Sequence, residues 1–202
     1  MSGLAPAERT LVVGCAALVR ELRSALDGLP VDVVLLPAGL HNRPERIPAA
    51  VDEALVRHGV AGRRAVVAYA DCGTGGQLEP VLERHGARRL AGAHCYEVIA
   101  SPAVFAALAE EEPGTFYLTE FLARAFDALV VGGLGLDRHP ELRDAYFAHY
   151  RRVVLVVPVA TDDLVALGRR AAERLGLAFE VREVGDAPFR QALLPLVGEG
   201  VA

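Results

Sequence analysis

The chain has 202 residues and a net charge of −5, and 52 % of its residues are hydrophobic, enough for a substantial core. All 21 basic residues are Arg, so the sequence has neither a Schiff-base lysine nor the lysine of a phosphate-binding Walker loop. The negative net charge and the absence of a basic patch in the sequence argue against nucleic acid as the main partner.

The sequence contains no uninterrupted apolar run of about 18 residues, so it predicts no membrane span. The opening "MSGLAPAERT" lacks a basic region followed by an apolar stretch, and no secretory signal is expected. Three cysteines in such a chain favour reduced thiols and a cytoplasmic location. An odd count leaves no complete set of disulfides, and buried, inert thiols are the ordinary alternative.

The first half alternates short apolar runs with amphipathic segments. In chain order, the pattern predicts a strand (10–15), a helix (16–26), a strand (31–39), a helix (46–59), a strand running into a glycine-rich turn (64–76), a short helix (77–86) and a strand (88–95). Strands that are apolar throughout and alternate with amphipathic helices are typical of a parallel sheet covered on both faces.

The second half is less regular. The pattern predicts a helix in two pieces (97–112), two helices (121–131 and 140–150), a strand (152–160), a helix (162–176), a strand (177–184) and a last helix (189–197). The stretch "EPGTFYLTEFL" (112–122) is interpreted as a turn and helix cap that buries Phe116 and Leu118. The alternative is that it brings polar groups over the site, from Thr115, Tyr117, Thr119 and Glu120. We expect a single α/β domain over 1–202, with a Rossmann-like three-layer fold, a mainly parallel sheet and a joint between two lobes near 132–150.

Every cysteine follows a predicted strand closely. Cys15, Cys72 and Cys95 stand at three strand ends, and His41 follows the second strand. Ligands bind beyond the carboxyl ends of the strands in open parallel sheets. Neighbouring strands lie about 4.8 Å apart, so side chains of adjacent loops can meet. Three thiolates and an imidazole suit a zinc or iron ion, or an iron–sulfur cluster, although this convergence depends on the strand order.

Two neighbouring residues are candidates for supporting roles. Successive side chains of a strand point to opposite sides, so Cys95 is preferred as the ligand over His94, which becomes a second ligand or a partner of the ligands. Glu97 or His94 would move a proton. A catalytic cysteine without metal is the alternative, with His94 or His41 lowering the pKa of its thiol.

The glycine-rich turn "DCGTGG" suggests an anion cradle built by Gly73, Thr74, Gly75 and Gly76, because bare amides at a helix start favour anions. It matches neither the dinucleotide-binding nor the Walker pattern. The alternative is a tight turn around Cys72.

Five stretches resemble one known family: "LPAGLHNRPE", "AYADCGTGG", "GAHCYEV", "EEPGTFYLTEFL" and "GLGLDRHPELRDAYFAHYRR". Together they are similar to the domain-of-unknown-function family DUF1638. The resemblance implies a similar fold and supplies no activity. Members often occur beside corrinoid proteins and corrinoid-dependent methyltransferases of one-carbon metabolism, and zinc-bound thiolate is common in methyl transfer to and from thiols.

Three functions stay open at this point. The first is a zinc- or iron-dependent enzyme that acts on a small thiol or methylated substrate, with a corrinoid protein or methyltransferase as partner. The second is a metal or iron–sulfur protein that serves as a carrier, sensor or electron donor without catalysis of its own. The third is a small-molecule binding module with inert thiols. The oligomeric state, a homo-oligomer included, is also left open.

Overall fold

The computed structural model describes residues 9–59 and 62–198. The chain divides into two compact units, Met1–Val98 with Phe189–Ala202, and Ile99–Pro188. The expected α/β class with parallel strands is confirmed, but the strands form two sheets, of four and three strands. The segment 132–150, where the sequence suggested a joint, lies inside the second unit. No helix among the described residues is long and apolar enough to cross a bilayer.

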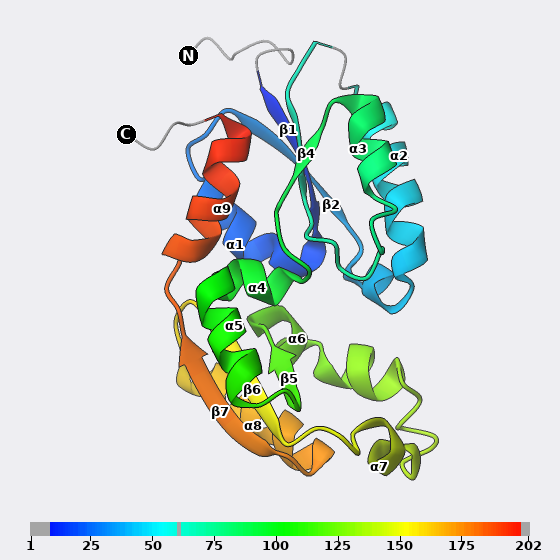
Figure 1. Cartoon of the computed structure of the whole chain (residues 1–202), viewed down its shortest axis with the longest axis vertical. Helices are drawn as coiled ribbons and strands as arrows, with labels where there is room; N and C mark the ends of the chain where they lie inside the picture. The colour runs from blue at the N-terminus through cyan, green and yellow to red at the C-terminus, as the bar shows by residue number, and fades with distance from the viewer. Residues whose placement is uncertain (1–8, 60–61, 199–202) are drawn as a thin grey trace. The chain divides into compact units, whose positions relative to one another are not determined.

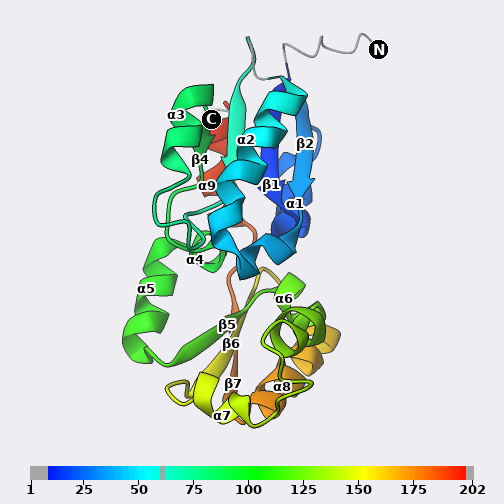
Figure 2. The same cartoon turned by 90° about the vertical axis from the view of Figure 1, so that its right-hand side faces the viewer.

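The first unit is built on a four-stranded parallel sheet, drawn in Figures 1 and 2. Its strands lie in the order β2 (Val31–Leu36), β1 (Thr10–Cys15), β3 (Ala65–Ala68), β4 (Arg88–Arg89). Its helices are α1 (Val19–Leu26), α2 (Ile47–His58), α3 (Glu79–His85) and α9 (Ala187–Val197). In Figure 1, α1 and α9 lie on one face of the sheet, and α2 and α3 lie on the other.

This strand order has a direct consequence for the cysteines. All four strands are parallel, so their carboxyl ends reach the same edge of the sheet. The central strands β1 and β3 are buried along most of their length, with Val12, Val13, Val66 and Val67 each 0 % exposed. Burial on both faces explains why their sequences are apolar without alternation.

The strand expected over 88–95 is wrong beyond its first residues. β4 ends at Arg89, and Cys95 is the first residue of the helix α4 (Cys95–Ala100). The chain turns at Gly92, whose φ of 107° lies in the left-handed region that favours glycine. A Cβ there would also lie only 2.9 Å from the Glu97 carboxylate, so a bulkier residue would not fit without a shift.

The second unit has a three-stranded parallel sheet in the order β5 (Thr115–Leu118), β6 (Arg152–Val157), β7 (Ala178–Glu183). Its helices are α5 (Pro102–Glu111), α6 (Glu120–Arg124), α7 (Leu142–Tyr146) and α8 (Asp162–Leu175), with a π-helical turn at Asp127–Gly132. The interpretation of 112–122 as only a turn and cap is corrected. Four of its residues form β5, and Thr119 then caps α6 by accepting a hydrogen bond from Leu122 N.

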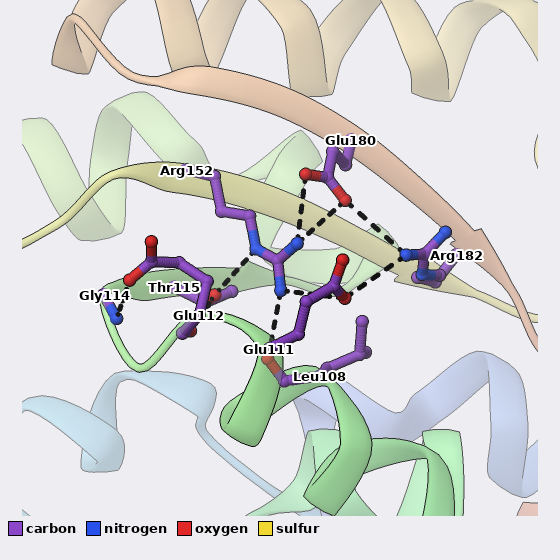
Figure 3. A network of polar contacts seen from close by, with 8 residues as sticks. All are labelled: Leu108, Glu111, Glu112, Gly114, Thr115, Arg152, Glu180 and Arg182. Atoms are coloured by element: carbon purple, nitrogen blue, oxygen red, sulfur yellow. Dashed lines mark hydrogen bonds and ion pairs between the residues drawn. The ribbon is translucent and has the colours of Figure 1, made fainter.

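One buried charge ties this sheet to α5, as Figure 3 shows. Arg152 on β6 is 5 % exposed. Its Nη1 donates to both carboxylate oxygens of Glu180 on β7, at 3.0 and 3.1 Å. Its Nε donates to Thr115 Oγ1 on β5 at 2.9 Å, and its Nη2 donates to Leu108 O at 3.0 Å and to Glu111 at 3.4 Å. A buried guanidinium is tolerated because its donors are paired in this way.

Candidate thiol and imidazole site

The ends of β1 and β2 bring Cys15 and His41 together. Cys15 is the last residue of β1 and is 1 % exposed. Its Sγ accepts a hydrogen bond from Ala17 N at 3.3 Å and lies 3.6 Å from His41 Nδ1. His41 belongs to the short 3-10 helix Ala38–Asn42 that follows β2, and its Nδ1 also lies 3.2 Å from Ala38 O. The predicted meeting of these two loops therefore occurs.

The loops after β3 and β4 are joined through their backbones. Asp71 N donates to Gly92 O at 3.0 Å, and Cys72 N donates to Ala93 O at 2.8 Å. These bonds continue the strand pairing past the end of β4, because adjacent parallel segments share their amides and carbonyls. They place Cys72 next to Cys95, close enough for each thiol to shift the pKa of the other.

The backbone at Cys72 is unusual. Its φ is 51°, one of only two positive φ values at non-glycine residues in the described part of the chain. A left-handed conformation costs a residue with a Cβ about 1 to 3 kcal/mol and tends to persist where the surroundings hold it, often at functional sites. Here the bond to Ala93 and the turn at Gly73 hold it. The fold thus holds the backbone of Cys72 in an unfavourable conformation, and this conformation sets the direction of the thiol.

The electrostatics of the cluster follow from these contacts. The hydrogen bond from Cys95 lowers the pKa of Cys72 against the effect of burial, and His41 lowers it further, to about 5. The pKa of Cys95 is raised well above its ordinary value, first by its bond to Cys72 and then by burial. Burial lowers the pKa of His41, but the neighbouring thiols of Cys15 and Cys72 outweigh burial and raise it to about 10. The metal-free protein therefore holds a Cys72 thiolate beside a His41 imidazolium.

These shifts predict a stability plateau in the metal-free protein. From pH about 5 to 6.5, the unfolded chain keeps a Cys72 proton that the folded protein has lost, so the free energy of unfolding rises with pH. From pH 6.5 to 9.0, the folded protein also keeps a His41 proton that the unfolded chain has lost. This opposite effect cancels the rise, so the free energy of unfolding stays constant. Above pH 9.0 the His41 effect remains, and Cys95, whose raised pKa keeps it protonated in the folded protein, acts in the same direction, so stability falls as pH rises.

Urea unfolding of the metal-free protein at a series of pH values checks this profile. The Cys72→Ser variant should lose the rise below the plateau, because it lacks the thiolate that the folded state stabilises. A variant with the same rise as the parent protein would contradict the assignment of that proton to Cys72.

A tyrosine that the sequence did not single out completes the cluster. Tyr69 follows β3 directly and is 0 % exposed. Its ring is stacked on that of His41, with centroids 6.2 Å apart and an interplanar angle of 16°. Burial raises the pKa of Tyr69, and its interactions with Cys15, Cys72 and Cys95 raise it further. The only sequence signal was its position, between an apolar strand and a cysteine.

Two polar atoms of this cluster stand out. Within the part of the chain that the structure describes, His41 Nε2 and Tyr69 Oη are buried without a hydrogen-bond partner. The thiols lie close enough to shift the pKa of both groups, yet none meets either atom at ordinary hydrogen-bonding distance and angle. Because buried polar atoms are nearly always paired in proteins, these two atoms are available to pair with a bound ligand.

His94 and Glu97, the other two candidates near Cys95, make different contacts. The ring of His94 stacks on Tyr96, with centroids 5.0 Å apart. The Glu97 carboxylate accepts a hydrogen bond from Ala93 N at 2.7 Å, so it supports the loop that carries Cys95. A role for His94 or Glu97 in proton transfer stays a prediction.

The glycine-rich turn closes on a carboxylate of the protein. Gly75 N and Gly76 N donate to the Asp71 carboxylate at 3.1 and 2.9 Å, and Thr74 Oγ1 donates to it at 2.8 Å. The bonds from Gly76 and Thr74 lower the pKa of Asp71 despite some desolvation. Because the amides of Gly75 and Gly76 already donate to the Asp71 carboxylate, the arrangement favours a tight turn at Gly73 over an anion cradle. Asp71 was not among the candidates from the sequence, although an Asp just before such a turn is a known signal of turn formation.

The positions of the Cys and His side chains and their donor chemistry bear differently on metal binding. Across residues 9–59 and 62–198, no group of three or more His, Cys, Asp or Glu side chains is placed so that it could hold a metal as it stands. The donor chemistry nevertheless fits, since three free thiols and an imidazole are the soft ligands that zinc and iron prefer. Coordination would therefore require these side chains to turn toward one point.

Fold and site together define a parallel α/β protein with a thiol and imidazole cluster at the carboxyl edge of its larger sheet. The family model described as "Protein of unknown function (DUF1638)" matches residues 35–193, and the chain belongs to this family. The matched range includes His41, Tyr69, Cys72 and Cys95 and begins after Cys15. A search of curated proteins finds no match to the chain.

Proposed function

We propose that Cys15, His41, Cys72 and Cys95 bind a zinc or iron ion, and that the protein acts in methyl-transfer chemistry of one-carbon metabolism. The observation that carries the metal proposal is His41, whose Nδ1 lies 3.6 Å from Cys15 Sγ, whose pKa Cys72 also shifts, and whose buried Nε2 has no partner among the described residues. The four residues stand at or after the ends of four different strands, which makes chance proximity a poor explanation.

Physical chemistry favours a cation at this place. Burying several ionisable thiols and an imidazole is costly unless they are paired or coordinate a metal. Without metal, the pKa of Cys72 is strongly lowered, whereas the pKa of Cys95 is raised by its contact with Cys72 and by burial, and repulsion between neighbouring thiolates adds to the rise. A divalent cation would remove that repulsion and allow the thiols to ionise together.

The methyl-transfer part of the proposal is supported by the family. The resemblance to this family implies that members often occur beside corrinoid proteins and corrinoid-dependent methyltransferases, and on that ground such a protein is the expected partner. A bound zinc or iron ion would deprotonate a small thiol substrate that coordinates it at neutral pH. The residues of this chain would then bind and orient that thiol or its methylated form.

Two candidates compete with this proposal. An iron–sulfur cluster held by the same four residues would make the protein a carrier, sensor or electron donor. A metal-free thiol enzyme is favoured by the spacing of the side chains as they stand and by the lowered pKa of Cys72. In that case Cys72 would be the nucleophile and His41 its charged partner.

Metal analysis of the untagged protein, purified without oxygen from cells supplied with iron and zinc, tests the three candidates. We expect about one zinc or iron ion per chain, as in other Cys and His sites. Absorbance near roughly 400 nm with several irons would instead indicate a cluster. Metal-free protein with three freely titrating thiols would contradict the metal proposal and leave the thiol enzyme.

A further inference from the structure

The metal site as proposed so far gives no role to the hydroxyl of Tyr69. Three thiols and His41 already supply four soft ligands, which completes the usual zinc set. The hydroxyl is nevertheless buried beside these residues and has no hydrogen-bond partner among the described residues. Tyr69 itself is 0 % exposed, so its hydroxyl does not reach solvent.

The surroundings of Tyr69 hold its ring in place. The ring is stacked on His41, and its backbone directly continues β3, the strand that leads to Cys72. The thiols of Cys15, Cys72 and Cys95 lie near enough to the hydroxyl to raise its pKa. A buried, unpartnered hydroxyl beside His41 is available to donate to a ligand that these residues bind.

We propose that Tyr69 is a positioning residue that donates a hydrogen bond to an exchangeable ligand of the metal. This inference rests on the proposed metal site and deepens it. A protonated phenol is a donor, so the favoured ligand carries an acceptor atom, as the thiolate sulfur of a small thiol or another small anion does. In this arrangement one of the four protein ligands leaves or the metal accepts a fifth group.

Cobalt(II) in place of zinc makes ligand exchange visible in the absorbance spectrum. The full chain, loaded with cobalt, is titrated with azide, which keeps an acceptor atom after it coordinates, and with imidazole, which keeps only an N–H donor. Tyr69→Phe should weaken azide binding by about tenfold, the effect of one hydrogen bond to a charged acceptor. Its affinities for imidazole and for cobalt should match those of the parent protein.

Tyr117→Phe is the matched control, because it removes the hydroxyl of a tyrosine in the second unit. It should leave both titrations unchanged. Equal azide affinity in the parent protein and Tyr69→Phe would overturn the role of Tyr69 and leave the metal site intact. Equal losses of azide and imidazole affinity would also overturn it, since they indicate a general change of shape. Failure of the parent protein to bind cobalt would overturn this inference together with the proposed function, and that outcome is seen before any ligand is added.

Discussion

Replacing His41 with Gln should weaken zinc binding by about 100-fold or more, whereas His85→Gln should leave it unchanged. His41 Nδ1 lies 3.6 Å from Cys15 Sγ, and its Nε2 is buried without a partner among the described residues. A glutamine fills a similar volume but is a poor ligand for zinc. His85 is the control because it is also largely buried in the first unit, where its Nε2 lies 2.6 Å from Asp52.

Competition against a chromogenic zinc chelator measures these affinities, and circular dichroism verifies that each variant folds. The same assay on His94→Gln decides between the two histidines near the thiols. The stacking of His94 on Tyr96 favours His41 as the ligand. A large loss of affinity in His94→Gln, with His41→Gln unaffected, would contradict the proposed set and put the metal at the loop after β4.

Removing the guanidinium of Arg152 should lower the free energy of unfolding by about 3 kcal/mol in Arg152→Met. The methionine fills much of the space but leaves Thr115 Oγ1 and Leu108 O without their donor. Glu180 would also lose both of its bonds to the buried charge. Replacing one member of a buried charged network costs more than replacing all of it, because the remaining polar groups stay partly desolvated.

Arg182→Met is the matched control for this prediction. Arg182 approaches the same carboxylates, Glu111 at 3.6 Å and Glu180 at 3.7 Å, but its side chain is 43 % exposed. Water screens such a pair, so the loss should stay below about 1 kcal/mol. Urea unfolding of both variants measures the difference. Equal losses would show that burial of Arg152 adds nothing to the strength of its contacts.

Most helices and strands were predictable because their signals are local. The apolar runs at β1 and β6 and the amphipathic spacing of α1 and α8 are each complete within one segment. The two strand errors have a different origin. β4 is short and β5 was not predicted, because such short segments become strands through hydrogen bonds to a neighbour.

The candidate site shows the same division. The sequence indicated the three thiols and His41, because cysteines after apolar strands follow a recognisable pattern. It did not indicate Tyr69 or Asp71, whose roles depend on contacts with other loops or on turn geometry. It also expected His94 and Cys95 at the end of a strand, although Cys95 begins a helix.

By itself, then, the sequence determined the α/β class and the residue types available for chemistry. Both follow from local properties of the sequence, namely the spacing of apolar residues and the identity of each residue. Only the tertiary structure decided that the strands lie in the order β2-β1-β3-β4, and hence that their four following loops are neighbours. Strand order depends on pairing between segments far apart in the chain, and no local pattern encodes it. The proximity of Cys15 to His41 and of Cys72 to Cys95 is therefore a property of the sheet.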